Sequence, residues 1–258
     1  MSEVDSEGSD GGAGGAGGAG HRVIALWSAP RSRSTAFFRS AVERGDLTGL
    51  HEPFCNLRDF GETTVGGETV RSTKALIAAI RELPGRQRVF LKETTDYRYP
   101  EVEADKDFLR EVRHTFLIRR PAEVAASFYA LKPDMSREQI GLEYMHELYD
   151  TAVQTGQRPV VLDSDDLVNH PAEIMAAYWA EMGLEHRTEA LSWQPGKREE
   201  WARSDRWHTD VSRSSGFTKA AATYEVTVEN NATLAEFAAH HEPYYQSLYA
   251  KRLTVTPG

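Results

Sequence analysis

The 258-residue sequence contains very little cysteine. Its single cysteine, Cys55, excludes an internal disulfide and any metal site built from cysteines alone. Histidine–glutamate pairs begin at His51, His146 and His241, but none is followed by a second histidine four residues on, as the helical zinc motif of metalloproteases requires. We therefore expect no metal in the functional site.

Long apolar runs and an excess of positive charge are also missing. No stretch approaches the 18 or more apolar residues of a membrane span, and the N-terminus lacks the basic-then-apolar order of a signal peptide, which predicts a cytoplasmic protein. A formal net charge of -9 argues against nucleic acid or an anionic membrane as a general partner. An anionic ligand would therefore need a local basic pocket.

Residues 1–20 lack any apolar face that could be buried, and they end in "GGAGGAGGAG". Ordering so many glycines costs much conformational entropy, so we expect a flexible Gly/Ala-rich tail. The remainder, residues 21–258, is long enough for one large domain with a substantial core.

Short β-rich runs alternate with helical patterns from His21 onward. This alternation predicts an α/β fold, a single three-layer domain in which helices flank a central parallel sheet of about five strands. The strand candidates are "RVIALWS", "TGLHEP", "QRVFLKE", "HTFLIR" and "RPVVLD". The helix candidates are Ser34–Glu43, Thr73–Arg81, Asp105–Arg113, Pro121–Ala130, Arg137–Thr155, residues 170–184, and residues 231–253 with an interruption near Pro243.

The first strand candidate runs directly into "SAPRSRST", residues 28–35. A strand, a tight turn and a helix that starts with hydroxyl side chains is an arrangement that binds phosphate-like anions through backbone N–H groups and the helix dipole. The turn is not a Walker A motif, because the two glycines and the lysine are absent and Arg31 takes the place of the lysine. Ser34 and Thr35 could equally cap a helix beside solvated arginines, so this turn alone leaves both interpretations open.

A second basic turn follows the strand candidate "HTFLIR". Arg119 and Arg120 end the strand, Pro121 starts a helix, and Ser127 lies about two helical turns further on. Two basic turns at the carboxyl ends of parallel strands define one crevice. A ligand with phosphate groups at both ends suits such a crevice.

These two turns resemble the motifs of the sulfotransferases that use 3'-phosphoadenosine 5'-phosphosulfate (PAPS). "PRSRST" is similar to the loop around the 5'-phosphosulfate, and "RRPAEVAAS" to the segment that holds the 3'-phosphate. A third stretch, "DSDDLVNHPAEIMAAYWAEMGL", resembles the acidic-Asp-Leu, proline and helix that follow in the family, so the likeness covers residues 22–184. It implies the P-loop-like sulfotransferase fold, PAPS as cosubstrate, and as its ligands Arg31, Ser32, Arg33, Ser34, Thr35, Arg119 and Ser127.

The sequence departs from the family pattern at several positions. Arg33 stands where many members have glycine, and Arg31 replaces the usual lysine, which gives it an electrostatic role because a guanidinium keeps its proton. The late Arg-Lys-Gly loop of cytosolic members has its nearest equivalent in Arg213, Ser215 and Gly216, which we assign to the 3'-phosphate.

The general base is the least determined part of the site. Many members have a histidine at the end of the third strand, but here Lys92 is followed by Thr94 at the histidine's position. Some bacterial relatives instead use a glutamate just after the second strand, where this chain has His51 and Glu52. We take Glu52 as the first choice of base and His51 as the second, with Lys92 near the transferring group. Weaker candidates for the base are Glu93 and Asp96, and the acceptor pocket is expected to include Trp207, His208 and Phe217.

The expected function is transfer of a sulfuryl group from PAPS to a hydroxyl or amine of a small-molecule acceptor, as in bacterial specialised metabolism, with adenosine 3',5'-bisphosphate as product. Three alternatives remain open. One is a kinase or nucleotidase with a modified phosphate loop, for which Asp163 is the candidate magnesium ligand. The others are a sulfation step that drives elimination or cyclisation, and a non-catalytic binder of adenosine 3',5'-bisphosphate.

Overall fold

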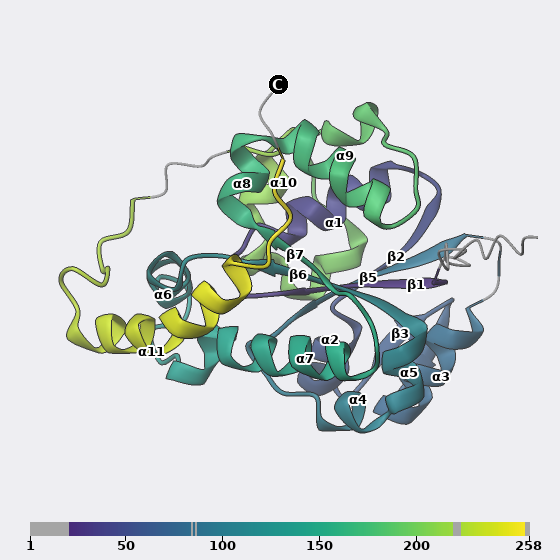
Figure 1. The fold of residues 1–258 in the computed structure, drawn as a ribbon, viewed down its shortest axis with the longest axis horizontal. Coiled ribbons are helices and arrows are strands. Elements are labelled where there is room, and N and C mark those ends of the chain that lie inside the picture. The colour runs from purple at the N-terminus through teal and green to yellow at the C-terminus, as the bar shows by residue number, and fades with distance from the viewer. Residues whose placement is uncertain (1–20, 84, 86, 219–222, 256–258) are drawn as a thin grey trace, which may run out of the picture.

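A central sheet of five parallel strands organises the chain, with strand order β2-β5-β1-β6-β7 (Figure 1). The computed structural model describes residues 21–83, 85, 87–218 and 223–255; the predicted tail, residues 1–20, lies outside them. The strands are β1 (Val23–Ser28), β2 (Leu47–His51), β5 (Arg88–Thr94), β6 (Val112–Ile118) and β7 (Val160–Asp163). Each coincides with one of the five strand candidates, which confirms the predicted α/β class.

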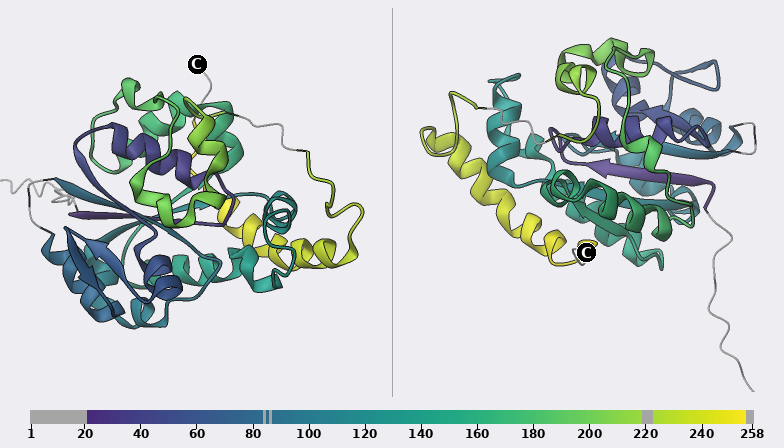
Figure 2. Two further views of the ribbon diagram at one scale, coloured as in Figure 1. Left: turned by 180° about the vertical axis from the view of Figure 1, so that it is seen from behind. Right: turned by 90° about the horizontal axis from the view of Figure 1, so that it is seen from above.

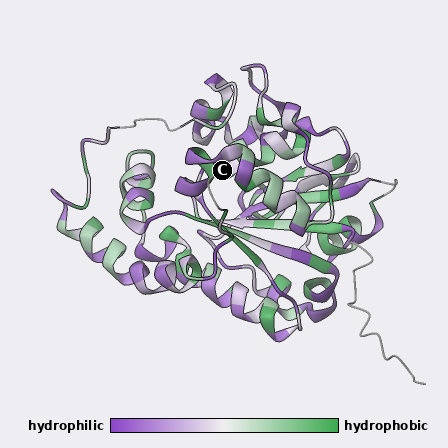
Figure 3. Cartoon of the chain, turned by 45° about the horizontal axis from the view of Figure 1, so that its top comes forward, coloured by the Kyte–Doolittle hydropathy of each residue, from purple (hydrophilic) through white to green (hydrophobic). Residues whose placement is uncertain are grey.

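Both faces of the sheet are covered, and β1 shows how one sequence serves both. Val23, Ala25 and Trp27 belong to one hydrophobic cluster, whereas Ile24 and Leu26 belong to the other. Successive side chains of a strand point to opposite faces, so a strand buried on both sides reads as a continuous apolar run. Figure 3 shows this as green strands between helices that are partly purple.

The helices divide between the two faces according to these clusters (Figures 1 and 2). One face carries α1 (Ser34–Glu43), α8 (Ser164–Asn169), α9 (Pro171–Glu181), the 3₁₀ segments η2 (Thr188–Leu191) and η3 (Glu199–Trp207), and α10 (Thr209–Arg213). The other carries α2 (Pro53–Phe60), the hairpin β3 (Thr63–Val65) and β4 (Glu68–Val70), α3 (Thr73–Glu82), α4 (Pro100–Ala104), α5 (Lys106–Glu111), α6 (Pro121–Tyr129), η1 (Arg137–Ile140), α7 (Leu142–Gln154) and α11 (Ala232–Tyr249).

Three helix predictions were wrong in detail. The helix expected over Arg137–Thr155 is broken at Gly141, which has a φ of 81° and where a Cβ would come within 2.8 Å of the Thr95 carbonyl oxygen. The helix expected over Asp105–Arg113 ends before Val112, because β6 begins there. The interruption expected near Pro243 is absent: α11 runs through it, since an exposed helix tolerates the loss of one backbone donor when its apolar face is well packed.

The carboxyl ends of all five strands meet at one edge of the sheet. β1 lies in the middle, with α1 leading from it to β2 on one side while β6 pairs with it on the other. This is the topological switch point where open α/β sheets form their ligand crevice. Among the described residues, no helix is long and apolar enough to cross a membrane.

Candidate active site

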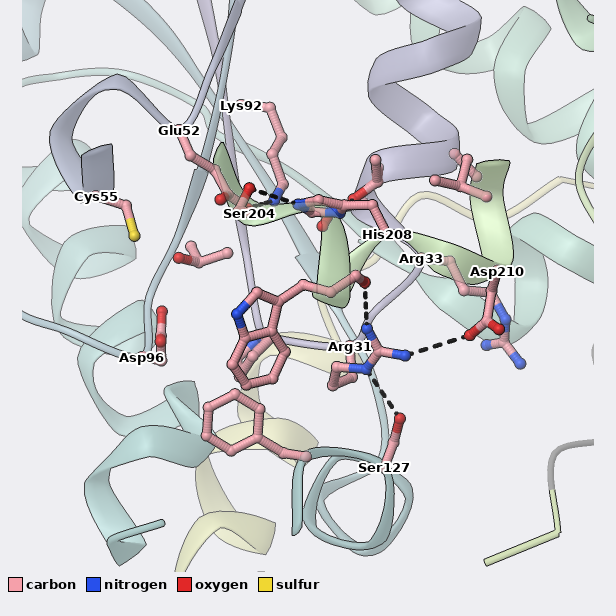
Figure 4. Close-up of a pocket in the computed structure, with 18 of the residues that line it drawn as sticks. Arg31, Arg33, Glu52, Cys55, Lys92, Asp96, Ser127, Ser204, His208 and Asp210 are labelled. Carbon is pink, nitrogen blue, oxygen red and sulfur yellow. Dashed lines mark hydrogen bonds and ion pairs between the residues drawn. The ribbon is translucent and has the colours of Figure 1, made fainter. Parts of the chain in front are cut away.

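A cavity of about 390 Å³ opens at this edge of the sheet (Figure 4). Its walls come from the β1–α1 turn, the start of α2, the end of β5, helix α6 and the η3–α10 segment. The two predicted anion turns and the predicted base therefore face one space, although they are far apart in the sequence.

The β1–α1 turn holds two residues other than glycine in left-handed backbone conformations. Arg31 has a φ of 60° and Arg33 a φ of 67°, a region that costs an ordinary L-residue about 1–2 kcal/mol. Ser32, one of the predicted ligands, does not line the cavity: its buried hydroxyl donates to the Ala29 carbonyl at 2.6 Å and fixes the turn. Ser34 lines the cavity at the first turn of α1, where the helix dipole favours an anion.

The Arg31 side chain connects the two anion turns. Its Nε donates to the Ser127 hydroxyl at 3.0 Å, Nη1 to the Trp207 carbonyl at 2.6 Å, and Nη2 to the Asp210 carboxylate at 3.3 Å (Figure 4). Arg119 in turn donates to the Arg31 carbonyl at 2.6 Å. The guanidinium of one turn and the hydroxyl of the other thus form one polar surface.

Two further arginines of the anion turns, Arg33 and Arg119, are held by residues that do not line the cavity. Arg33 donates to the Ser164 hydroxyl at 3.0 Å and pairs with Asp165 at 3.4 Å. Arg119 pairs with Glu123 at 2.8 Å, one turn along α6. These contacts fix the positions of both guanidinium groups at the wall of the cavity.

Glu52 and Lys92 form a buried ion pair on the β2–β5 side of the cavity, and both line it. Burial alone would raise the pKa of Glu52, but the charge and hydrogen bond of the Lys92 ammonium lower it to about 2. The Glu52 backbone is left-handed, with a φ of 48°, and its N–H donates to the Lys92 carbonyl at 2.7 Å. The Glu52 side chain is therefore an ionised carboxylate held just after the carboxyl end of β2.

Glu93 caps helix α2 in place of Glu52. Its carboxylate accepts from the N–H groups of Phe54 at 2.8 Å and Cys55 at 3.2 Å, and from the Tyr99 hydroxyl at 3.2 Å. Glu52 occupies the N-cap position but makes no side-chain cap. Because Glu93 supplies the cap from β5, the Glu52 carboxylate remains available to the cavity. Burial and the charge of Glu52 raise the pKa of Glu93 to about 8.

The two histidines predicted for the site lie side by side. His208 lines the cavity, where its Nδ1 is 3.0 Å from the Thr35 hydroxyl and its Nε2 3.0 Å from the Ser204 hydroxyl. His51 lies behind it, with ring centroids 4.9 Å apart, and packs against Trp201. Burial lowers the pKa of His208 to about 4 and that of His51 well below its usual value, so both imidazoles are neutral.

Of the other predicted site residues, some line the cavity and some do not. Trp207, Gly216 and Phe217 line the cavity, whereas Arg213 and Ser215 do not. Several residues of the cavity walls were not predicted from the sequence. Phe128 stacks on Trp207 with centroids 5.2 Å apart, and Tyr224 donates to the Ser127 hydroxyl at 2.8 Å. Neither residue belongs to a motif, so no local signal identified it.

The wall beyond Glu52 is formed by residues of α2 and of the loop after β5. Cys55 of α2, Thr94 at the end of β5 and Asp96 in the following loop line it, with Lys132 from the segment after α6. Burial raises the pKa of Asp96 to about 6, and its Oδ1 has no hydrogen-bond partner among the described residues. This part of the cavity is therefore lined mainly by polar and ionisable groups.

Both carboxylate oxygens of Asp163, the candidate magnesium ligand, accept hydrogen bonds within the protein. One carboxylate oxygen accepts from the N–H groups of Asp165 at 2.9 Å and Asp166 at 3.2 Å, and the other accepts from the Tyr245 hydroxyl at 3.0 Å. Asp163 therefore caps α8 rather than facing the cavity.

Several known proteins resemble this chain in sequence. "Branched-chain-amino-acid aminotransferase-like protein 2" of Arabidopsis thaliana is 27% identical over 206 residues, which are 76% of this chain and 36% of that protein. "Sulfotransferase ppzF" of Metarhizium majus is 26% identical over 153 residues, 49% of this chain and 45% of that protein. The chain thus spans about a third to a half of the length of these curated relatives.

Among solved structures, a sulfotransferase from Alicyclobacillus acidocaldarius aligns with a TM-score of 0.51 at 13% identity, over 89% of this chain and 96% of that one. At this identity the match concerns the fold, and it agrees with the central parallel sheet described above. The sequence model of the family described as "Sulfotransferase domain" matches residues 21–251. The chain belongs to this sulfotransferase family.

Proposed function

We propose that the protein transfers the sulfuryl group of PAPS to a hydroxyl of a small-molecule acceptor and releases adenosine 3',5'-bisphosphate. The observation that carries this proposal is the convergence of two anion turns and a buried carboxylate on one cavity. Arg31, Ser34 and Thr35 would bind the 5' end, and Arg119 and Ser127 the 3'-phosphate. The direct contact between Arg31 and Ser127 supports a donor that reaches both turns.

The reaction needs a base, an in-line arrangement and positive charge at the leaving oxygen. The acceptor oxygen attacks sulfur as the bond from sulfur to the 5'-phosphate oxygen breaks, and the acceptor proton passes to Glu52. Arg31 would stabilise the charge that develops on the leaving oxygen, which a guanidinium does without losing its proton.

Lys92 gives Glu52 a way to become a stronger base. In the free protein the ammonium pairs with the carboxylate and depresses its pKa. An incoming sulfuryl group is a competing anion for Lys92, and a carboxylate left in so buried a place has a raised pKa. We infer that donor binding draws Lys92 toward the sulfuryl oxygens and leaves Glu52 ready to accept a proton.

His51 is a weaker candidate for this role than Glu52. Glu52 lines the cavity, while His51 lies behind His208 and Trp201. His208 faces the cavity between Thr35 and Ser204, which suits a residue that orients the acceptor or the sulfuryl group. The kinase or nucleotidase alternative loses support, because the carboxylate of Asp163 is occupied as a helix cap.

The decisive experiment has a binding arm and a turnover arm. Calorimetry should show that adenosine 3',5'-bisphosphate binds far more tightly than AMP, because AMP lacks the phosphate assigned to Arg119 and Ser127; equal affinities would contradict the donor assignment. Mass spectrometry of an acceptor library incubated with and without PAPS should then reveal products heavier by one sulfuryl group. Bisphosphate binding without any product would indicate a non-catalytic binder, and a desulfated alkene or ring would indicate elimination or cyclisation.

A further inference from the structure

We propose that His51, Glu52 and His208 together bind a zinc(II) ion, and that this ion inhibits the enzyme. The potential ligand atoms of these three buried side chains all lie within 4.8 Å of one another. Histidine and carboxylate side chains in this ratio are typical zinc ligands, and a fourth position would open toward the cavity. Tetrahedral zinc needs ligand atoms roughly 3.4 Å apart, so small side-chain rotations complete the site.

His51 provides independent support for a missing ligand. It is 6% exposed, and within the part of the chain that the structure describes neither of its ring nitrogens has a hydrogen-bond partner. A buried imidazole without partners costs free energy, because its polar atoms have lost water and gained nothing. A metal ion beside Glu52 would give one of these nitrogens a partner.

The surrounding hydroxyls also suit a metal. His208 has Thr35 at one ring nitrogen and Ser204 at the other. When one nitrogen turns to the metal, the other keeps its hydroxyl contact, and such outer contacts hold metal-binding histidines in place.

Lys92 is the competitor for this site. Its ammonium pairs with Glu52 and supplies the positive charge that a metal would otherwise bring. Zinc must therefore displace Lys92 or share the carboxylate with it, which weakens binding. This competition makes an unusual prediction: removing Lys92 strengthens the metal site instead of damaging it.

The inhibition rests on the proposed function of Glu52. A carboxylate oxygen that coordinates zinc cannot accept the acceptor proton, so turnover falls while the anion turns remain free to bind adenosine 3',5'-bisphosphate. Zinc binding itself does not depend on the reaction, and can be measured on protein that has no identified acceptor.

The experiment uses the full chain without a histidine tag. Zinc is added to the purified protein and excess metal is removed by gel filtration. The ratio of bound zinc to protein is then measured by elemental mass spectrometry. Cobalt(II) is then substituted to obtain the absorption spectrum of a tetrahedral site. We expect one ion per chain and a zinc-dependent loss of turnover. Absence of bound zinc and of a tetrahedral cobalt spectrum in the unaltered chain would overturn the proposal, whether or not sulfuryl transfer is observed.

Variants separate this cluster from other histidines. His208→Ala and His51→Ala should each lower the affinity for zinc at least about 100-fold, since even the loss of a group that only contacts a ligand lowers metal affinity by about 10–100-fold. Lys92→Met should raise the affinity for zinc by roughly tenfold or more. His146→Ala is the matched control, because His146 pairs with Asp150 at 3.2 Å on α7, away from the cavity, and should leave zinc unchanged. Unchanged zinc binding in folded His208→Ala, or weaker binding in Lys92→Met, would contradict the assignment.

Discussion

The two halves of the cavity are built in different ways. The half at β1 and β6 consists of two local turns, each running from a strand into the next helix with its arginines a few residues apart. The half at β2 and β5 consists of contacts between distant residues, because Lys92 pairs with Glu52 and Glu93 caps the helix that follows Glu52. In the proposed reaction, the first half would bind the anionic donor and the second half would accept the proton.

The difference shows how charge is managed in each half. Arg33 and Arg119, whose side chains are 16% and 11% exposed, each pair with a carboxylate that does not line the cavity, Asp165 and Glu123 respectively. The Glu52–Lys92 pair is almost completely buried, where a charge persists only with a partner. We therefore expect changes in the first half to alter affinity and changes in the second half to alter turnover.

The largest expected effect tests the second half. Glu52→Gln keeps the size of the side chain but removes the base, so turnover should fall by about 10²–10⁴-fold. Affinity for adenosine 3',5'-bisphosphate, measured by calorimetry, should stay within a few-fold because the anion turns are intact. The matched control is His51→Gln, which should retain most of the turnover. If the control loses turnover and Glu52→Gln does not, the order of the two bases is reversed.

The next effect tests the first half. Arg119→Ala should weaken adenosine 3',5'-bisphosphate by roughly 10- to 150-fold, the equivalent of about 1.5–3 kcal/mol for a hydrogen bond to a charged group. AMP, which lacks the 3'-phosphate, should bind the variant and the original protein alike. Arg120→Ala is the control, since Arg120 is mostly exposed and pairs with Asp165 outside the cavity. Equal losses for both nucleotides would place Arg119 elsewhere than at the 3'-phosphate.

The sequence predicted the first half better than the second, for a physical reason. Turns that lead from a strand into a helix are local, so the positions of Ser34, Arg119 and Ser127 followed from short motifs and from the parallel order of the strands. The role of Glu93 depends on the register of β2 against β5, which sets His51 opposite Lys92. No spacing in the sequence encodes that register.

The closing segment of the cavity was equally hard to predict. Trp207, His208 and Asp210 reach Arg31 and Thr35 across more than 170 positions of the chain. They lie in 3₁₀ turns and a five-residue helix, where neither the helical nor the strand period gives a signal. Composition pointed to aromatic residues in this region, but only the structure assigned their partners.

A smaller effect tests how the two halves depend on helix α2. Glu93→Ala removes the one carboxylate oxygen that accepts from the buried N–H groups of both Phe54 and Cys55, so the free energy of unfolding should fall by about 1–3 kcal/mol. Turnover should fall as well, because Glu52 begins this helix, while bisphosphate affinity should not change. Thermal and denaturant unfolding measure the change in stability, and steady-state kinetics measures the change in turnover. Tyr99→Phe is the control: it removes one contact to Glu93 and leaves both helix N–H groups capped.

The smallest expected effect tests strain in the first half. Arg33→Gly relieves a left-handed backbone conformation that costs about 1–2 kcal/mol. Against this, the more flexible unfolded chain lowers the free energy of unfolding by about 0.5–1 kcal/mol. The contacts to Ser164 and Asp165 are also lost. These changes largely cancel, so stability should shift by less than about 1 kcal/mol in denaturant unfolding. Bisphosphate affinity should decrease, because one cation of the anion turn is gone. Arg33→Lys keeps both the charge and the strain, and should bind more like the original protein. A large loss of stability in Arg33→Gly, without any in Arg33→Lys, would show that the side-chain contacts outweigh the backbone strain in this turn.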